Sequence, residues 1–303
     1  MEFMVQYPLA HPAPPEFLRP DHVAEFAKAA ESAGFAALGF TEHPAPSRRW
    51  LASGGHESFD PLAALAFCAA VTHRIRLMTY LSVVPYHRPL LLAKAAATVD
   101  VLSGGRLVMV VGSGYLRSEF THLDVDFARR NDLLEAGLRS MRAVWSDADD
   151  SMDGSPAGPV SRPLPVQRSG PPLWFGGNSR VARRRAVELG SGWSPNQYAP
   201  VMAASARTPA LSTMAELGDA IGELRAALSV AGRSNDAFDI QVASPRSMEP
   251  PASRGLVDHV AELESIGATW FVHVPPHDSF DRCIEAIAEF GATVIAATRS
   301  RRR

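Results

Sequence analysis

The sequence predicts an α/β fold, a (β/α)8 TIM barrel with insertion loops at the rim where the C-terminal ends of its strands meet. Short apolar runs alternate with helical patterns along the chain, and eight such pairs can be counted. The length of 303 residues also suits one barrel, since such barrels span roughly 250 residues or more. A doubly wound open parallel sheet is the alternative that the same alternation allows.

The eight predicted strands are short segments rich in β-branched and apolar residues. They cover residues 2–8, 36–43, 75–83, 106–114, 172–177, 191–196, 238–244 and 269–276. Helical patterns follow them at residues 21–34, 60–71, 89–104, 117–145, 179–190, 214–232, 255–267 and 279–291. Several of these patterns end in glycine after the last apolar residue, which is a common helix C-cap.

Composition limits the class of protein. Hydrophobic residues make up 46% of the chain, charged residues 20%, and the formal net charge is −2, so we expect neither nucleic acid nor a membrane as a partner. Cys68 and Cys283 are the only cysteines and fit a reducing compartment. With no leader pattern and no apolar run of the roughly 20 residues that a membrane span needs, we expect a cytoplasmic protein with residues 1–303 in one domain.

Three stretches rich in proline, glycine and small polar residues interrupt the pattern, at residues 146–172, 197–213 and 245–254. None of them can bury much apolar surface. We expect all three on the loop-rich faces of the barrel, with 146–172 entering from the rim either as a substrate lid or as a surface insertion.

The stretch LWFGGNSRVARRRA, residues 173–186, predicts an anion site. It reads as a buried strand, a GGNS turn and a helix whose N-cap is Asn178 or Ser179. Exposed backbone amides and the helix dipole favour a phosphate at such a turn. Four arginines follow within the first turns, Arg180, Arg183, Arg184 and Arg185. The alternative is a capped helix with a solvated basic face.

Most other chemical motifs are weak. The GSGYL turn, Gly112 to Leu116, lacks the third glycine of a dinucleotide fingerprint and is not a GxSxG nucleophile elbow. Prolines between His273 and His277 exclude the helical spacing of a zinc site, so we predict no metal. His43 is the better candidate because it ends the second predicted strand beside Glu42, at the barrel mouth. There it can act as a general acid or base, or simply cap the loop.

Residues 75–120, with the motifs AKAAATVDVLSGGRL and VGSGYLRSEF, resemble the luciferase-like monooxygenase superfamily, in particular its flavin- and deazaflavin-dependent oxidoreductases. DFARRN and PPLWFGGNSRVARRRAVELGSGW continue the resemblance, which is weaker at FTEHP and fades after about residue 195. The resemblance implies a (β/α)8 barrel, usually a homodimer, that holds FMN or coenzyme F420 at its C-terminal rim.

The resemblance also implies site residues. The turn Gly176, Gly177, Asn178 and Ser179 would receive the cofactor phosphate, and the turn Gly112, Ser113, Gly114 and Tyr115 would contact the ring and ribityl chain. A bulge with a non-proline cis peptide would back the ring at Thr79, Tyr80 and Leu81, and Glu42 and His43 would lie at the ring edge. Tyr115 stands where sugar-phosphate dehydrogenases of the family have an acidic residue, so we do not expect a sugar-phosphate substrate.

We therefore predict an oxidoreductase that transfers a hydride between coenzyme F420 and a small organic substrate. Arg180, Arg183 and Arg184 lie on one helix face and would follow the anionic tail of that cofactor. One alternative is an FMN-dependent monooxygenase supplied by a partner flavin reductase. Another is a barrel that binds flavin without catalysing a reaction, and on either alternative the arginines could be solvated or paired with Glu188 and other carboxylates.

Overall fold

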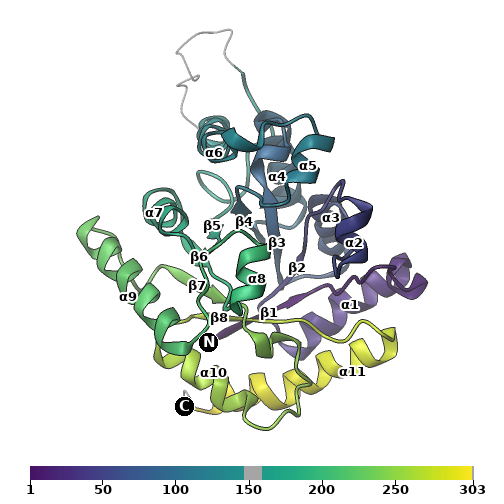
Figure 1. Cartoon of the computed structure of the whole chain (residues 1–303). Helices are drawn as coiled ribbons and strands as arrows, with labels where there is room; N and C mark the ends of the chain where they lie inside the picture. Colours follow the sequence, from purple (N-terminus) through teal and green to yellow (C-terminus); the bar gives the residue numbers. More distant parts are fainter. Residues whose placement is uncertain (147–158, 302–303) are drawn as a thin grey trace.

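A computed structural model of the chain describes residues 1–146 and 159–301. Eight parallel strands form a closed barrel in which each strand pairs with its neighbour in sequence, and β1 closes on β8 (Figure 1). The strands are β1 (Glu2–Gln6), β2 (Ala37–Phe40), β3 (Arg76–Val83), β4 (Leu107–Gly112), β5 (Leu173–Gly176), β6 (Gly192–Ser194), β7 (Asp239–Val242) and β8 (Trp270–His273). The predicted (β/α)8 barrel is confirmed, and the open sheet is excluded.

The main helices cover the outside of the barrel. They are α1 (Pro20–Ala33), α3 (Pro61–Val71), α4 (Pro89–Leu102), α6 (Arg130–Trp145), α7 (Arg180–Leu189), α9 (Met214–Val230), α10 (Leu256–Ser265) and α11 (Phe280–Phe290). Short helices lie between them: α2 (Arg48–Ala52), α5 (Arg117–His122), α8 (Pro200–Ser205) and α12 (Ala296–Arg301). Single turns occur at η1 (Pro15–Leu18), η2 (Val84–Tyr86), η3 (Phe127–Arg129), η4 (Pro245–Met248) and η5 (Gly291–Ile295).

Local capping explains where several helices begin and end. Asp60 accepts a hydrogen bond from Ala63 N at the start of α3, and Thr213 forms a capping box with Glu216 at the start of α9. Gly34 ends α1 with φ of 91°, a left-handed conformation that glycine adopts without a steric penalty.

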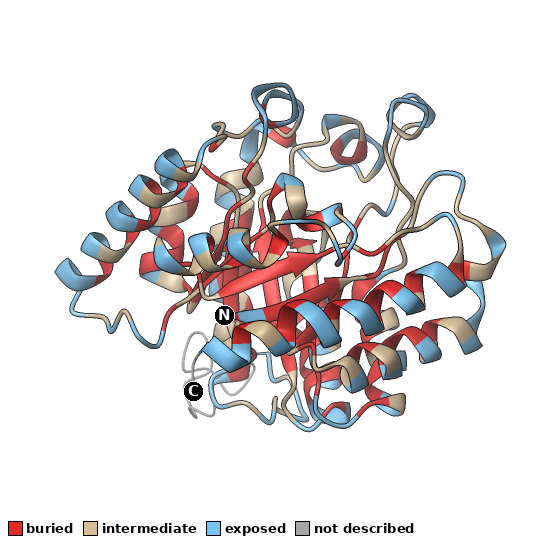
Figure 2. Ribbon diagram, turned by 90° about the horizontal axis from the view of Figure 1, so that it is seen from below, coloured by how far each residue is buried: buried red, intermediate tan, exposed pale blue. Residues whose placement is uncertain are grey.

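The core has two layers. Between strands and helices, buried side chains such as Phe26, Leu38 and Leu65 form the larger cluster, and helices turn their buried faces inward (Figure 2). Inside the barrel, eight buried residues pack together: Met4, Ala37, Met78, Val108, Val110, Trp174, Trp270 and Val272. The barrel is therefore a packed core, and a ligand can lie only at its mouth.

Some boundaries differ from the prediction. The second strand ends at Phe40, so His43 lies in the loop after it, and the helical run 117–145 divides into α5, η3 and α6. The segments 197–213 and 245–254 follow strands β6 and β7 and carry α8 and η4 at the C-terminal rim, as expected. In the described ranges, no helix is both long and apolar enough to span a bilayer.

The expected position of the segment 146–172 is wrong. Its described residues, 146 and 159–172, follow α6 and precede β5, which places them at the N-terminal face of the barrel. In its described part, Gln167 Nε2 donates to Asp100 Oδ1 at 2.7 Å and to Leu107 O, at the first residue of β4, at 2.7 Å. The rest of the predicted lid, residues 147–158, lies outside the described residues. A connection from helix to strand returns to the end opposite the site, so the described part cannot cover the mouth.

Candidate functional site at the barrel mouth

A bulge in β3 shapes the floor of the mouth. The ladder between β3 and β4 shifts register between Thr79 and Ser82, and the Tyr80–Leu81 peptide is cis, as the resemblance implied. The Leu81 side chain reaches across the strand ends. A Cβ at Gly112 would lie 2.8 Å from Leu81 Cδ1, and one at Gly176 would lie 2.3 Å from Leu81 Cδ2. Both glycines are needed because Leu81 occupies the space that side chains there would fill.

Two predicted residues in this region use their polar groups within the protein. The Thr79 hydroxyl is buried and donates to Val110 O at 2.7 Å. The buried Glu42 carboxylate accepts from Val83 N at 2.5 Å and from His87 Nε2 at 2.9 Å. Burial alone would lower the pKa of His87, but its hydrogen bond to Glu42 and the charge of that carboxylate raise the pKa above its ordinary value. Glu42 thus holds the end of β3, and a direct contact with cofactor stays a prediction.

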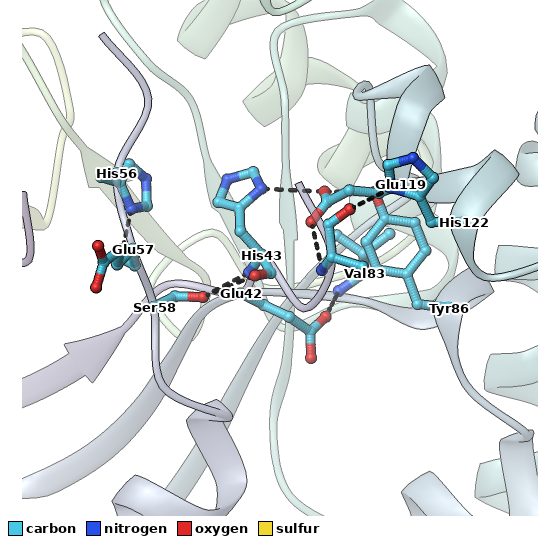
Figure 3. Close-up of polar contacts among 10 residues, drawn as sticks. Glu42, His43, His56, Glu57, Ser58, Val83, Tyr86, Glu119 and His122 are labelled. Carbon is cyan, nitrogen blue, oxygen red and sulfur yellow. Dashed lines mark hydrogen bonds and ion pairs between the residues drawn. The ribbon is translucent and has the colours of Figure 1, made fainter. Parts of the chain in front are cut away.

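His43 is held by a buried carboxylate that no sequence motif indicated. Its Nδ1 lies 3.0 Å from Glu119 Oε2 (Figure 3), and the same oxygen accepts from Tyr86 OH at 3.0 Å. The other oxygen, Oε1, accepts from Ala45 N at 3.3 Å. Glu119 is 0% exposed, so its charge is balanced only by these donors. This arrangement orients the imidazole and directs Nε2 away from Glu119, where a reacting group could meet it.

Aromatic side chains enclose the His43 ring. The centroid of its ring lies 4.4 Å from that of Trp50, 5.0 Å from that of His56 and 6.1 Å from that of Tyr115. Burial chiefly lowers the pKa of His56, and burial chiefly raises the pKa of the Tyr115 phenol, so both are neutral near pH 7. The structure thus brings together two predicted site residues, His43 and Tyr115, and the aromatic side chains around them suit the binding of a flat ring.

Glu119 carries a signal that was available in the sequence. It lies in α5, on the loop that follows β4, and loops after barrel strands carry the functional residues of this fold. The sequence pattern assigned it to the start of a long helix, where a glutamate reads as an exposed residue. Its role in holding His43 is visible only in the folded chain, where the loop after β2 brings His43, 76 residues earlier in the sequence, to the carboxylate.

The GGNS turn forms as predicted, and Ser179 is the N-cap, with Oγ accepting from Ala182 N at 3.1 Å. Gly177 has φ of 100°, and a Cβ there would meet only Ala182 Cβ at 3.9 Å, so the turn is open on that side. The polar groups of Asn178 bind within the protein: its N donates to Thr208 Oγ1, and its side chain binds Asn196 and Pro209. No acceptor within residues 1–146 and 159–301 binds the amides of Ser179, Arg180 and Val181.

The arginines of α7 are mostly paired, as in the alternative interpretation. Arg183 donates to Asn178 O at 2.9 Å and to Glu223 Oε2 at 2.7 Å. Arg184 pairs with Glu188 and Glu135, and the buried Arg185 binds Glu135 and Asn131. Arg180 is exposed and is the one arginine of the four with no partner among the described residues. A row of free cations along this helix is therefore not present.

The mouth also contains polar atoms that fit a bound ring. Tyr80 Oη and Ser82 Oγ are buried without a hydrogen-bond partner in the described part of the chain. Burial, and then Tyr198, raises the pKa of the Tyr80 phenol, so it is a neutral donor. On the neighbouring turn, Ser113 is half-buried, and Gly114 has φ of 75°. Unused donors beside an open, amide-rich turn are what a ring with an attached phosphate requires.

The histidines weighed as metal ligands do not form such a site. His273 stacks on Phe290, with ring centroids 4.3 Å apart, on the outer face of the barrel. Asp278 pairs with Arg282. Across the described ranges, no group of three or more histidine, cysteine or acidic side chains could hold a metal ion.

Known proteins resemble this chain over much of its length. It is 34% identical over 185 residues to an uncharacterized protein of Mycobacterium tuberculosis, covering 56% of this chain and 66% of that one. It is 30% identical to an F420-dependent glucose-6-phosphate dehydrogenase of Tsukamurella paurometabola, over 50% of this chain and 45% of the relative. An FMNH2-dependent dimethylsulfone monooxygenase of Pseudomonas putida is 28% identical over 57% of this chain and 47% of the relative. The matches thus span less than two thirds of each relative.

Structure comparison and the family model agree. The monooxygenase RslO1 from Streptomyces bottropensis superimposes with a TM-score of 0.78 at 19% identity, covering 98% of this chain and 100% of that one, which shows a shared fold. The family model described as luciferase-like monooxygenase matches residues 1–263. Relatives named for coenzyme F420 and relatives named for FMN both occur. The chain belongs to the luciferase-like monooxygenase family.

Proposed function

We propose that this protein is an oxidoreductase that transfers a hydride between coenzyme F420 and a small organic substrate, with His43 as the general acid or base. The observation that carries the proposal is the hydrogen bond between His43 and the buried carboxylate of Glu119 at the barrel mouth. Hydride transfer at a carbon that bears oxygen needs a proton moved at that oxygen, and a histidine held by a carboxylate is suited to that task.

The residues present fit such a cofactor. The amides of Ser179 to Val181 and the open face of Gly177 would hold the phosphate, and the floor formed by Leu81 with Tyr80 would carry the ring. When bound, the deazaflavin supplies hydride chemistry. His43 Nε2 would give or take the substrate proton, Glu119 would hold the ring of His43 in position, and Trp50 and Tyr115 would exclude water from it.

FMN is the second candidate, as the cofactor of a monooxygenase that receives reduced flavin from a partner reductase. The ion pairs of Arg183 and Arg184 favour it, because they remove the row of free charges that an acidic tail along α7 would use. FMN ends at its phosphate, for which the turn alone is sufficient. Tyr115 in place of an acidic residue disfavours a sugar phosphate as substrate for either cofactor.

The test is an anaerobic titration of the apo protein with F420 and with FMN, followed by turnover. We expect tighter binding of F420 and reoxidation of reduced F420 by members of a panel of ketones, aldehydes and imines. His43→Asn should abolish most turnover and keep cofactor affinity. The control variant His122→Asn, at an exposed residue of α5, should keep both turnover and cofactor affinity. Tighter FMN binding with oxygen consumption would replace the proposal by the monooxygenase, and binding without any turnover would indicate a non-catalytic barrel.

We also propose that the protein is a homodimer through its outer helices. Phe67 of α3 and Leu91 and Leu102 of α4 are 40%, 70% and 63% exposed. Large apolar side chains that gather on neighbouring helices are typical of an interface.

A further inference from the structure

A basic cavity lies beside the phosphate turn. It has a volume of about 620 Å³ and is lined by residues of α5, η3 and α6 together with Arg207 from the loop after β6. Three guanidinium groups surround the ring of Phe127: the Cζ atom lies 4.5 Å from the ring centroid in Arg117, 4.1 Å in Arg130 and 5.5 Å in Arg207. We refer to this cluster as the arginine cavity.

The three positive charges of the arginine cavity exceed the one carboxylate, Asp126, that lines it. None of the three arginines forms an ion pair with a carboxylate of the described residues, although most arginines of nearby α7 do. Asp126 lines the cavity, but its Oδ1 accepts from Ala128 N. Burial, and then the charges of Arg207 and Arg117, lowers the pKa of Arg130. Like charges held this close repel one another, and an anion between them would relieve that repulsion.

The geometry also leaves donors available. Arg130 uses Nη1 to donate to Phe127 O at 3.0 Å, whereas the guanidinium groups of Arg117 and Arg207 make no hydrogen bond with any described residue. Guanidinium groups stacked near an aromatic face keep their N–H groups free for carboxylate or phosphate oxygens. Three such forks around one cavity suit a group with several carboxylates better than a single phosphate.

Two short connections link the arginine cavity to the proposed cofactor turns, one to the phosphate turn and one to the Gly112 to Leu116 turn. Thr208, which follows Arg207, accepts from Asn178 N at 2.9 Å, so the loop after β6 links the turn to the cavity. Arg117 follows the Gly112 to Leu116 turn directly in the chain. The loop after β6 therefore places Arg207 next in sequence to a residue that contacts the proposed phosphate turn.

We propose that Arg117, Arg130 and Arg207 bind carboxylate groups of an acidic extension that continues beyond the cofactor phosphate. This inference rests on the proposed function, since the tail of coenzyme F420 carries glutamates and FMN carries none. The arginine cavity then takes over the role that the sequence assigned to the α7 arginines. The arginine cavity would also let the protein distinguish coenzyme F420 from FMN by the glutamate tail, which lies beyond the phosphate and which FMN lacks.

The test is a fluorescence titration of the apo protein with four ligands at low and moderate salt. They are the deazaflavin core without phosphate, the phosphate form without glutamates, the form with several glutamates, and FMN. The variants are Arg117→Gln, Arg130→Gln and Arg207→Gln, and the matched control is Arg184→Gln, which removes an exposed arginine paired with Glu188. Circular dichroism checks that each variant is folded.

We expect each cavity variant to weaken the glutamate-bearing form on the order of 10-fold at low salt, because a hydrogen bond to a charged group contributes about that factor. The core, the phosphate form and FMN should bind the variants as they bind the natural protein, and Arg184→Gln should bind all four unchanged. If the cavity variants lost affinity for the phosphate form and for FMN as much as for the glutamate-bearing form, the arginine cavity would be a phosphate site and the inference would be overturned.

The inference can fail while the proposed function stands. Unchanged binding of the glutamate-bearing form by all three variants would overturn the role of the arginine cavity, and binding of the tail-less deazaflavins would still support F420 as cofactor. A natural protein that binds FMN and none of the deazaflavins would reject both.

Discussion

Replacing Glu119 by glutamine tests the arrangement of the site most directly. The carboxylate accepts from His43 Nδ1 and Tyr86 OH through one oxygen and from Ala45 N through the other. Glutamine has one acceptor oxygen and one donor nitrogen. In one orientation of the amide, its NH2 group faces Ala45 N, a donor that then lacks an acceptor. In the other, it faces His43 Nδ1, which can then only accept, so the imidazole changes tautomer. In both, the negative charge beside the imidazole is lost.

The expected size of the effect follows from these contacts. A hydrogen bond to a charged group contributes about 1.5–3 kcal/mol, and about 1.4 kcal/mol corresponds to a tenfold change in rate. Glu119→Gln should therefore lower kcat/KM by about 10- to 100-fold if the ion pair supports the imidazolium form during reaction.

The assay is steady-state turnover over a range of pH, with cofactor affinity and thermal unfolding measured on the same samples. Glu57→Gln is the matched control. Glu57 accepts from His11 Nδ1 at 2.9 Å and from Ala13 N at 3.3 Å, the same kinds of donor, but its carboxylate lies in an exposed pair and shares no hydrogen bond with His43. An unchanged kcat/KM in Glu119→Gln, or an equal loss of activity in Glu57→Gln, would refute the positioning role.

Four further predictions follow from other parts of the molecule. His43→Ala should lower turnover by about 10²- to 10⁴-fold with cofactor affinity retained, and full turnover would exclude acid or base catalysis. Burial lowers the pKa of His273 from 6.5 to about 4, so between these pH values the unfolded chain binds a proton that the folded chain does not. The free energy of unfolding should therefore be highest above about pH 6.5 and fall by about 3 kcal/mol towards pH 4, and His273→Gln should remove this fall in denaturant titrations at several pH values. Gly177→Ala should destabilise the protein by about 1 kcal/mol and weaken cofactor binding, because a residue with a side chain rarely adopts a φ of 100°. Unchanged cofactor affinity in a titration of this variant would place the phosphate elsewhere. Leu91→Glu should convert the proposed dimer to a monomer in sedimentation, and a monomeric natural protein would exclude the dimer.

Most of the fold was determined locally, and the sequence therefore predicted it. The alternation of apolar strands with helical patterns depends on neighbours within one element, and all eight strands lie inside the predicted segments. The helix start was likewise predicted to within one residue, Asn178 or Ser179, since a cap bonds only to the next turn, and Ser179 is the N-cap. The β3 bulge and the cis peptide at Tyr80–Leu81 were inferred from resemblance and not from the residues themselves.

Contacts between distant segments were decided by the tertiary structure alone. Glu119 reaches His43 across 76 residues, and no periodicity reports that distance. The α7 arginines could be weighed as free or paired, but Glu135 and Glu223, which lie on α6 and α9, decided for pairing once the helices packed side by side. The arginine cavity needed the same closure, because its three arginines come from α5, α6 and the loop after β6. Local sequence specifies each element and its caps, but charge balance is a property of the packed barrel, since it depends on which side chains the closed fold brings within a few ångströms.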